Sequence, residues 1–187
     1  KMQITRQQCQ QIANGWRGQL AIAVDNIVRP DRTRQMIVDF YRHFSDVELR
    51  VSQEVFNGVW DALADGRVEM AIGATQAIPV GGRYAFRDMG MLSWTCVVAS
   101  DHPLAAMEGP LSDDTLRNWP SLVLEDTSRS LPKRITWLLD NQRRVVAPDW
   151  ESSATCLSAG LCVAMVPVHF ARPRIDTGEW VELTLEN

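Results

Sequence analysis

The stretch from Asp46 to Thr75 constrains the fold most, because it predicts a strand, a helix and a second strand in close succession. Residues 46–53 alternate between apolar and polar side chains, as in a half-exposed strand. Apolar residues at helical spacing follow between 59 and 63, and Gly66 comes where helices commonly end. Residues 68–73 form a second, short strand. A helical crossover of this length joins parallel strands, so we predict a βαβ unit.

The carboxyl ends of these strands are candidate ligand contacts, because open parallel sheets bind ligands there. In the βαβ unit these ends are 53–56 and 73–75. A continuous apolar run at 20–24 predicts another strand, buried on both faces, which leads into Asp25, Asn26 and Ile27. A helix is expected to begin at Pro30, and its free backbone donors face these residues. From spacing alone, a ligand contact and an ordinary helix cap are equally good interpretations of 25–27.

Composition narrows the class of protein. Hydrophobic content of 45% and charged content of 22% over 187 residues are ordinary for a globular chain, and they allow one large or two small domains. A net charge of −4 argues against direct wrapping of nucleic acid, which needs a basic surface. The sequence has neither a signal peptide nor an apolar run of the roughly 18 residues that a membrane span needs. Four cysteines without a Cys-x-x-Cys pair predict free thiols, and a cytoplasmic location.

The chain lacks the motifs that would indicate catalysis. It contains no phosphate loop, no dinucleotide fingerprint, no nucleophile elbow and no zinc-protease helix motif. His43, His102 and His169 have no nucleophile or metal ligand at a persuasive spacing. We therefore predict a protein that is not an enzyme and that needs no metal or cofactor.

The remaining pattern predicts further α/β structure. Apolar spacing and strand alternation predict helices at 30–44, 113–118 and 149–159, and strands at 83–88, 92–99, 121–125, 143–148, 161–167 and 180–185. The segment 131–141 is compatible with either a helix or a strand, because Pro132 interrupts the pattern.

Polar residues at the strand ends, with aromatic residues close by in the sequence, predict a concave binding site. Fixed polar groups beside aromatic rings suit a small polar ligand with a flat ring. For each tryptophan taken singly, core packing is the better interpretation. The residues singled out on this basis are Asp25, Asn26, Glu54, Thr75, Thr127, Ser128 and Glu151, with Phe56, Trp94 and Trp150.

Four ordered motifs resemble the effector-binding domain of LysR-type transcriptional regulators. They are Leu63-x-x-Gly66-x-Val68-Glu69-Met70-Ala71-Ile72, His102-Pro103-Leu104-Ala105, Ser158-Ala159-Gly160-Leu161-Cys162-Val163-Ala164-Met165-Val166-Pro167, and Gly178-x-Trp180-Val181-x-Leu183. The resemblance runs from about Leu20 to the end of the chain. Val68, Glu69 and Met70 are mild departures from the usual Leu-Asp-Leu. More narrowly, the sequence is similar to enterobacterial members that respond to purine nucleosides.

The resemblance implies an α/β fold of two Rossmann-like subdomains joined by two crossover strands, as in type II periplasmic binding proteins. It implies that 1–16 is the C-terminal part of a linker helix. Residues 17–92 and 167–187 would form the first subdomain, with its C-terminal part incomplete, and 93–166 would form the second. A DNA-binding winged helix-turn-helix domain is expected to precede the linker.

The family's effector contacts fall on strand ends already singled out above. Carried over by position, these contacts are 25–27, 55–56, 73–75 and 127–128. We add Glu54 and Trp94 from the residue analysis, and Glu151 and Ser152 at the expected second crossover. The effector would be a small molecule, for which a purine nucleoside such as adenosine is a candidate. The predicted ligand-binding set is Asp25, Asn26, Ile27, Glu54, Val55, Phe56, Gly73, Ala74, Thr75, Trp94, Thr127, Ser128, Glu151 and Ser152.

The resemblance also implies partners and one rival function. The regulator would be a homodimer or homotetramer, with the helix from Pro30 to Phe44 packed on the second subdomain of a partner chain. DNA would be bound only through the upstream domain, and no membrane is involved. The rival is a periplasmic-type solute-binding protein, which shares the two-lobed cleft. An upstream helix-turn-helix in the full gene distinguishes the two.

Overall fold

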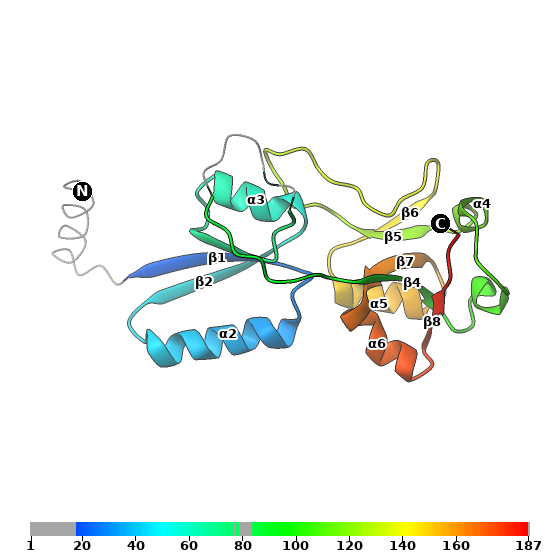
Figure 1. Cartoon of the computed structure of the whole chain (residues 1–187), viewed down its shortest axis with the longest axis horizontal. Helices are drawn as coiled ribbons and strands as arrows, with labels where there is room; N and C mark the ends of the chain where they lie inside the picture. The colour runs from blue at the N-terminus through cyan, green and yellow to red at the C-terminus, as the bar shows by residue number, and fades with distance from the viewer. Residues whose placement is uncertain (1–17, 77, 79–83, 187) are drawn as a thin grey trace.

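The computed structural model describes residues 18–76, 78 and 84–186, which form two α/β lobes side by side (Figure 1). The predicted linker helix at 1–16 lies outside the described residues. The first lobe contains β1 (Gln19–Asp25), α2 (Pro30–His43), β2 (Glu48–Glu54), α3 (Asn57–Ala64) and β3 (Met70–Ile72). The second lobe contains β4 (Trp94–Ala99), η1 (Pro103–Ala106), α4 (Asp113–Arg117), β5 (Ser121–Leu124), β6 (Arg144–Ala147), α5 (Trp150–Ser158), β7 (Val163–Pro167), α6 (Val168–Asp176) and β8 (Trp180–Leu183).

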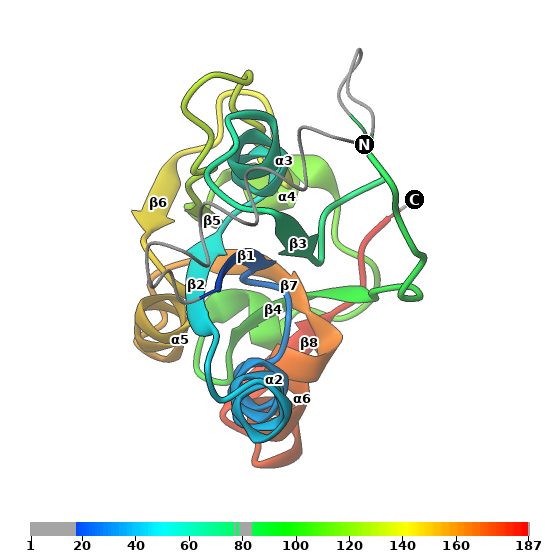
Figure 2. The same ribbon diagram turned by 90° about the vertical axis from the view of Figure 1, so that its left-hand side faces the viewer.

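The first lobe confirms the predicted parallel arrangement. Its sheet has the order β2-β1-β3, and β1 pairs in parallel with both neighbours, from Gln19 opposite Glu48 to Asp25 opposite Glu54. Helices α2 and α3 lie on opposite faces of this sheet (Figures 1 and 2). Gly66 ends α3 with a φ of 67°, the left-handed conformation that a glycine adopts without strain. The three parallel strands therefore end at one edge, beside the second lobe.

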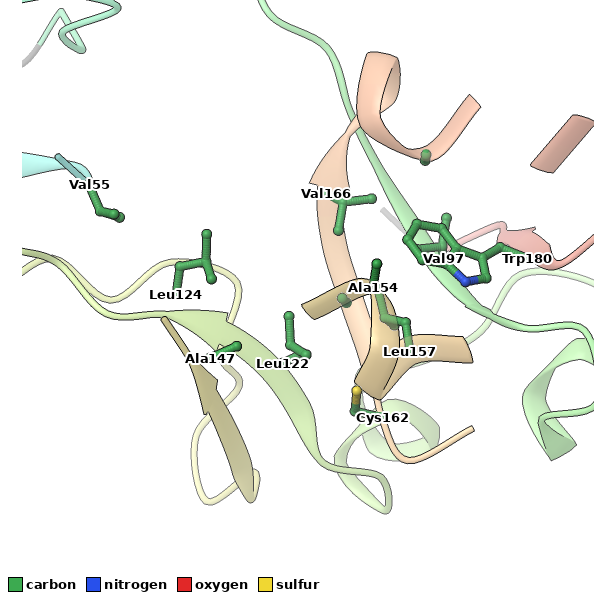
Figure 3. Packing of buried hydrophobic residues seen from close by; sticks show 12 residues of the cluster. Val55, Val97, Leu122, Leu124, Ala147, Ala154, Leu157, Cys162, Val166 and Trp180 are labelled. Atoms are coloured by element: carbon green, nitrogen blue, oxygen red, sulfur yellow. The ribbon is translucent and has the colours of Figure 1, made fainter. Parts of the chain in front are cut away.

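The second lobe is a mixed sheet of five strands in the order β6-β5-β7-β4-β8. Strands β5, β6 and β7 are parallel, whereas β4 runs antiparallel to both β7 and β8. The largest apolar cluster lies between this sheet and the helices α5 and α6, and it includes Val97, Leu157 and Trp180 (Figure 3). Val55 joins this cluster from the first lobe and lies near Leu124. The two lobes thus share part of one core.

The predicted assignment of 167–187 to the first subdomain is wrong for the described part of that segment. Strand β8 pairs with β4, with Trp180 opposite Ala99 and Leu183 opposite Cys96. Trp180 is 1% exposed in the core of the second lobe, which holds β8 there. Within the described residues the chain passes once from the first sheet to the second, between β3 and β4, and not twice.

Two local predictions also differ from the structure, and one helix was not predicted. The predicted edge strand at 83–88 is not a strand in its described part, 84–88, which runs as an extended connection without ladder partners. The ambiguous segment 131–141 is neither helix nor strand. Helix α6 was not predicted, because Pro173 inside it is unfavourable in a helix interior.

Among the described residues, none of the helices is both long and apolar enough to cross a membrane.

Candidate functional site

The turn after β1 places a buried carboxyl at the edge where the two lobes meet. Asp25 is 1% exposed, and its Oδ1 accepts a hydrogen bond from the backbone N–H of Ile27 at 3.0 Å. Its Oδ2 is buried and has no hydrogen-bond partner. Gly73 lies against this turn, where an added Cβ would come within 3.1 Å of the Asp25 Cβ. The absence of a side chain at 73 therefore lets β3 end directly beside Asp25.

Burial dominates the electrostatics of Asp25. Desolvation raises the pKa of this carboxyl to about 7, and the backbone N–H groups of Ile27 and Phe56 offset only part of the rise. Asp126, from the second lobe, raises the pKa further through charge repulsion. A carboxyl poised near neutral pH can accept a hydrogen bond when ionised and donate one when protonated.

Asn26 connects the two lobes. Its backbone N–H donates to the carbonyl oxygen of Glu54 at 3.0 Å, and its own carbonyl accepts from Nε1 of Trp150 at 3.0 Å. Its side-chain Nδ2 is buried without an acceptor. Thr75, at the end of β3, has a buried Oγ1 that is also unpartnered, while its carbonyl accepts from Nε1 of Trp60 at 3.0 Å. Neighbouring strand ends of the first lobe therefore carry three polar side-chain atoms without partners.

We call Asp25, Asn26 and Thr75 the polar rim. A row of aromatic side chains from the second lobe borders this rim. The rings of Trp94 and Trp150 are 6.3 Å apart between centroids, and Trp94 and Trp137 are 6.1 Å apart. Phe170 continues the row at 5.1 Å from Trp150. Rings at these separations and tilts attract one another and present flat apolar surface. Trp150 packs against the core of the second lobe, which was the alternative interpretation for it, and it also reaches the rim through Asn26. Trp94 is half-buried and contacts the rings of Trp137 and Trp150.

The loop after β5 is held against the amino end of α3 by reciprocal contacts, which we call the lobe junction (54–61 with 126–131). Thr127 Oγ1 donates to a carboxylate oxygen of Glu54 and accepts from the backbone N–H of Val55 at 2.9 Å. A Cβ at Gly58 would lie 1.9 Å from the same hydroxyl oxygen. Phe56 has a φ of 51°, an uncommon conformation for a bulky residue that costs of order 1–3 kcal/mol.

Two buried aspartates from opposite lobes secure the junction. Asp126 accepts hydrogen bonds from the backbone N–H groups of Asn57 and Gly58, both at 3.1 Å, at the start of α3. Asp61 in α3 accepts from the backbone N–H groups of the loop residues 129–131 at 2.9–3.0 Å, and from Arg67 Nη2 at 3.0 Å. Burial alone would raise the pKa of Asp61, but these donors outweigh it and hold the pKa below its usual value.

The structure brings most of the sequence-predicted residues together. Asn26, Glu54, Val55 and Thr127 are linked by the hydrogen bonds above, and Asp25 lies opposite Glu54 in the register of β1 and β2. Ser128 is buried, and its N–H donates to the Asp126 carboxylate at 2.8 Å. Ile27, Phe56, Gly73, Ala74 and Thr75 lie on the same strand ends.

Glu151 and Ser152 are not joined to the rim. Glu151 is exposed in the first turn of α5, and the Ser152 N–H caps that helix on Asp149 Oδ1 at 2.7 Å.

The sequence analysis did not predict four residues that lie at the polar rim or in the lobe junction: Trp150, Asp61, Arg67 and Asp126. Trp150 was noted as a nearby aromatic but not included in the predicted set, although it stands at the start of a helix next to Glu151. Asp61 and Asp126 carry no local sequence signal, because they accept hydrogen bonds from backbone groups far along the chain. Arg67 is closer in sequence to its partners Glu54 and Asp61, but no motif marks the three as a group. Among the described residues, no cluster of three His, Cys, Asp or Glu side chains suits a metal ion.

Two α/β lobes that meet at a polar rim and an aromatic row define a small-molecule-binding domain of the bilobal type. Residues 13–187 match the family described as the LysR substrate binding domain, and the chain belongs to that family. The family assignment inferred from the four motifs is therefore confirmed.

Similar proteins agree with this assignment. The chain is 85% identical over its whole length to the HTH-type transcriptional regulator PunR of Escherichia coli (strain K12), of which it spans 60%. The regulatory domain of MetR from N. meningitidis has a TM-score of 0.63 at 18% identity, with 90% of this chain and 78% of that one covered. The effector-binding domain of QuiR in complex with shikimate has a TM-score of 0.62 at 13% identity, covering 91% and 81%. The two structures establish the shared fold.

Proposed function

We propose that this chain is the effector-sensing part of a LysR-type transcriptional regulator, and that a small molecule with a flat ring and polar substituents binds between the lobes. Three buried side-chain atoms without partners carry the proposal: Asp25 Oδ2, Asn26 Nδ2 and Thr75 Oγ1. Buried polar atoms are nearly always paired, and an unpaired one costs about 1–3 kcal/mol. A ligand that supplies the missing partners would recover that free energy.

The donor and acceptor pattern of these atoms supports a purine nucleoside as the ligand. Ionised Asp25 accepts hydrogen bonds, as from the two hydroxyls of a ribose, and Asn26 Nδ2 donates one, as to a ring nitrogen of a purine. Thr75 Oγ1 can do either. The row of Trp94, Trp137 and Trp150 provides the flat surface on which a purine ring stacks.

Ligand binding of this kind favours one arrangement of the lobes. The three atoms are shielded from solvent here, and the Trp150–Asn26 hydrogen bond spans the lobes at the rim. A ligand must therefore separate Trp150 from Asn26 or displace the rim to enter. The three atoms are buried and unpaired in the present arrangement, and a ligand pairs with them only in the arrangement that admits it. The ligand therefore binds these two arrangements of the lobes with different affinity, which is the requirement for an effector.

The relation to transcription rests on the family and on the name of the 85% identical relative, an HTH-type regulator. We propose that a DNA-binding domain belongs to the same protein, that it acts in the cytoplasm, and that the chain itself catalyses no reaction. The rival interpretation as a solute-binding protein is not favoured by this relationship.

Helix α2 supports the proposed self-association. None of the residues in this helix is buried. Val38 and Tyr41 in the helix, and Phe44 directly after it, are 46%, 43% and 55% exposed. A helix with this much exposed apolar surface suits an interface between copies of the chain. Phe44→Glu should weaken the dimer, and Glu48→Gln, an exposed control, should not. Analytical ultracentrifugation that finds a wild-type monomer at micromolar concentration would contradict this part of the proposal.

Calorimetric titration with adenosine, adenine, ribose and benzoate tests the effector proposal. We expect adenosine to bind, and Asn26→Ala and Thr75→Val each to weaken binding about 10-fold, as the loss of one buried hydrogen bond of about 1.4 kcal/mol predicts. Thr177→Val is the matched control, because the Thr177 hydroxyl donates to the Arg174 carbonyl at an exposed helix end. Equal affinity in wild type and both rim variants would reject this site.

A further inference from the structure

A cavity lies on the outer side of the lobe junction, on the α3 face of the first sheet. Its volume is about 440 Å³. The polar residues that line it are Arg50, Ser52, Glu54, Arg67 and Arg129. Arg50, Ser52 and Glu54 alternate along β2 and so point to one face of the sheet. Arg129 enters from the loop after β5, which belongs to the second lobe.

One of the three arginines is fixed by the protein. Arg67 Nη1 donates to Glu54 Oε1 at 2.9 Å and Arg67 Nη2 to Asp61 Oδ2 at 3.0 Å. Both carboxylates are fully occupied, since Glu54 also accepts from Thr127 and Asp61 accepts from three backbone N–H groups. The acidic groups at the cavity are thus committed to partners within the junction.

The other two arginines have no acidic partner. Across 18–76, 78 and 84–186, no carboxylate forms an ion pair with Arg50 or Arg129. Both residues are exposed where they line the cavity. A guanidinium offers several N–H donors in a planar fork that matches the oxygens of phosphate. Two such groups from different lobes therefore face one cavity with their charges uncompensated.

We propose that this cavity binds a phosphate-type oxyanion held between Arg50 and Arg129, with the Ser52 hydroxyl as a further donor. The anion is either inorganic phosphate or the phosphate group of a small phosphomonoester, which the volume also admits. Because Arg50 lies in the first lobe and Arg129 in the second, a bound anion stabilises the arrangement in which the lobe junction is formed. The cavity lining includes none of Asp25, Asn26 and Thr75, so the proposal does not depend on the proposed effector.

Calorimetry on the intact chain with inorganic phosphate and with adenosine 5′-monophosphate tests the proposal. We expect wild type to bind at least one of them, and Arg50→Gln/Arg129→Gln to bind it at least about tenfold more weakly. Arg32→Gln/Arg34→Gln is the charge-matched control, because both side chains are exposed on α2, and it should bind as wild type does. Arg67 is left unchanged because it supports the junction. Thermal unfolding of each variant verifies that it is folded.

The outcomes separate the two ligand sources and the two proposals. Phosphate binding alone identifies the free ion, and tighter binding of the monophosphate than of phosphate to the Asn26→Ala variant identifies the ester. Asn26→Ala should bind phosphate as wild type does, although it binds adenosine more weakly. The effector proposal and the phosphate proposal can therefore be rejected independently of each other. The proposal is overturned if neither ligand binds at 10 mM, or if the control double variant loses as much affinity as Arg50→Gln/Arg129→Gln.

Discussion

Nε1 of Trp150 lies 3.0 Å from the carbonyl oxygen of Asn26, so a single hydrogen bond joins α5 of the second lobe to the end of β1 in the first. Trp150→Phe keeps an aromatic ring in the row but removes the donor. The Asn26 carbonyl then loses a buried partner, and we expect the free energy of unfolding to fall by about 1–3 kcal/mol in urea titrations. Trp137→Phe is the control, since Trp137 is 51% exposed, and it should change stability little. Equal losses in both variants would count against this bond.

The lobe junction should depend strongly on Asp126. Asp126→Ala removes the acceptor for the N–H groups of Asn57 and Gly58 in one lobe and of Ser128 in the other. Several buried donors without an acceptor cost about 3 kcal/mol or more in free energy of unfolding. Hydrogen exchange should accelerate first at Asn57 and Gly58. Asp140→Ala, an exposed loop variant, should have neither effect, and unchanged exchange at 57 and 58 in Asp126→Ala would refute the role of this carboxylate.

Gly58 and Thr127 should be energetically coupled. A methyl group at 58 would meet the Thr127 hydroxyl oxygen at 1.9 Å, although alanine is otherwise the better helix former. We expect Gly58→Ala to destabilise the fold by about 1–3 kcal/mol, the usual cost of overpacking. The cost should be smaller in the Thr127→Ala background, where that oxygen is gone. A double-mutant cycle measures this coupling, and purely additive effects would show that the two lobes are not in contact here.

Stability should fall as the pH rises toward neutrality because of Asp25. Burial raises the pKa of this carboxyl from 3.8 to about 7, so the folded protein binds the proton more tightly than the unfolded chain does. The contribution is complete below about pH 4 and disappears as the pH rises through about 7, a difference of about 4 kcal/mol. Asp25→Asn, which stays neutral, should remove this component. Urea titrations from pH 5 to 8 that show the same slope in both proteins would contradict the assignment.

Local sequence patterns were sufficient for elements whose burial is continuous or strictly alternating. The run at 20–24 and the alternation at 46–53 predicted β1 and β2, because the sheet geometry imposes those periods directly on the side chains. The same reasoning failed at 84–88, the described part of the predicted strand at 83–88, where an alternating pattern lies in a connection without a pairing partner in the described chain. An alternating pattern shows which side chains a strand could bury on one face. It does not show whether a neighbouring strand is present to pair with the segment.

Long-range contacts account for the remaining differences. The strand β8 was placed in the wrong lobe because its partner β4 is some 80 residues away and either sheet could have accepted it. Asp61 and Asp126 were not recognised because an aspartate in a helix or loop is usually solvated, and only the fold brings backbone donors 68–70 residues away to Asp61. The meeting of the strand ends at 25–27, 53–56 and 73–75 was easier to predict, since the carboxyl ends of parallel strands converge by topology alone.

Hydrogen–deuterium exchange with and without saturating adenosine tests the central claim most directly, because it reports where the ligand binds on both lobes at once. We predict slower exchange at 25–27 and 73–75 in the first lobe and in the first turn of α5, around Trp150, in the second. In Asn26→Ala, the same protection should require about 10-fold more adenosine. Adenosine-induced protection confined to one lobe, or none at the three segments, would contradict an effector site between the lobes.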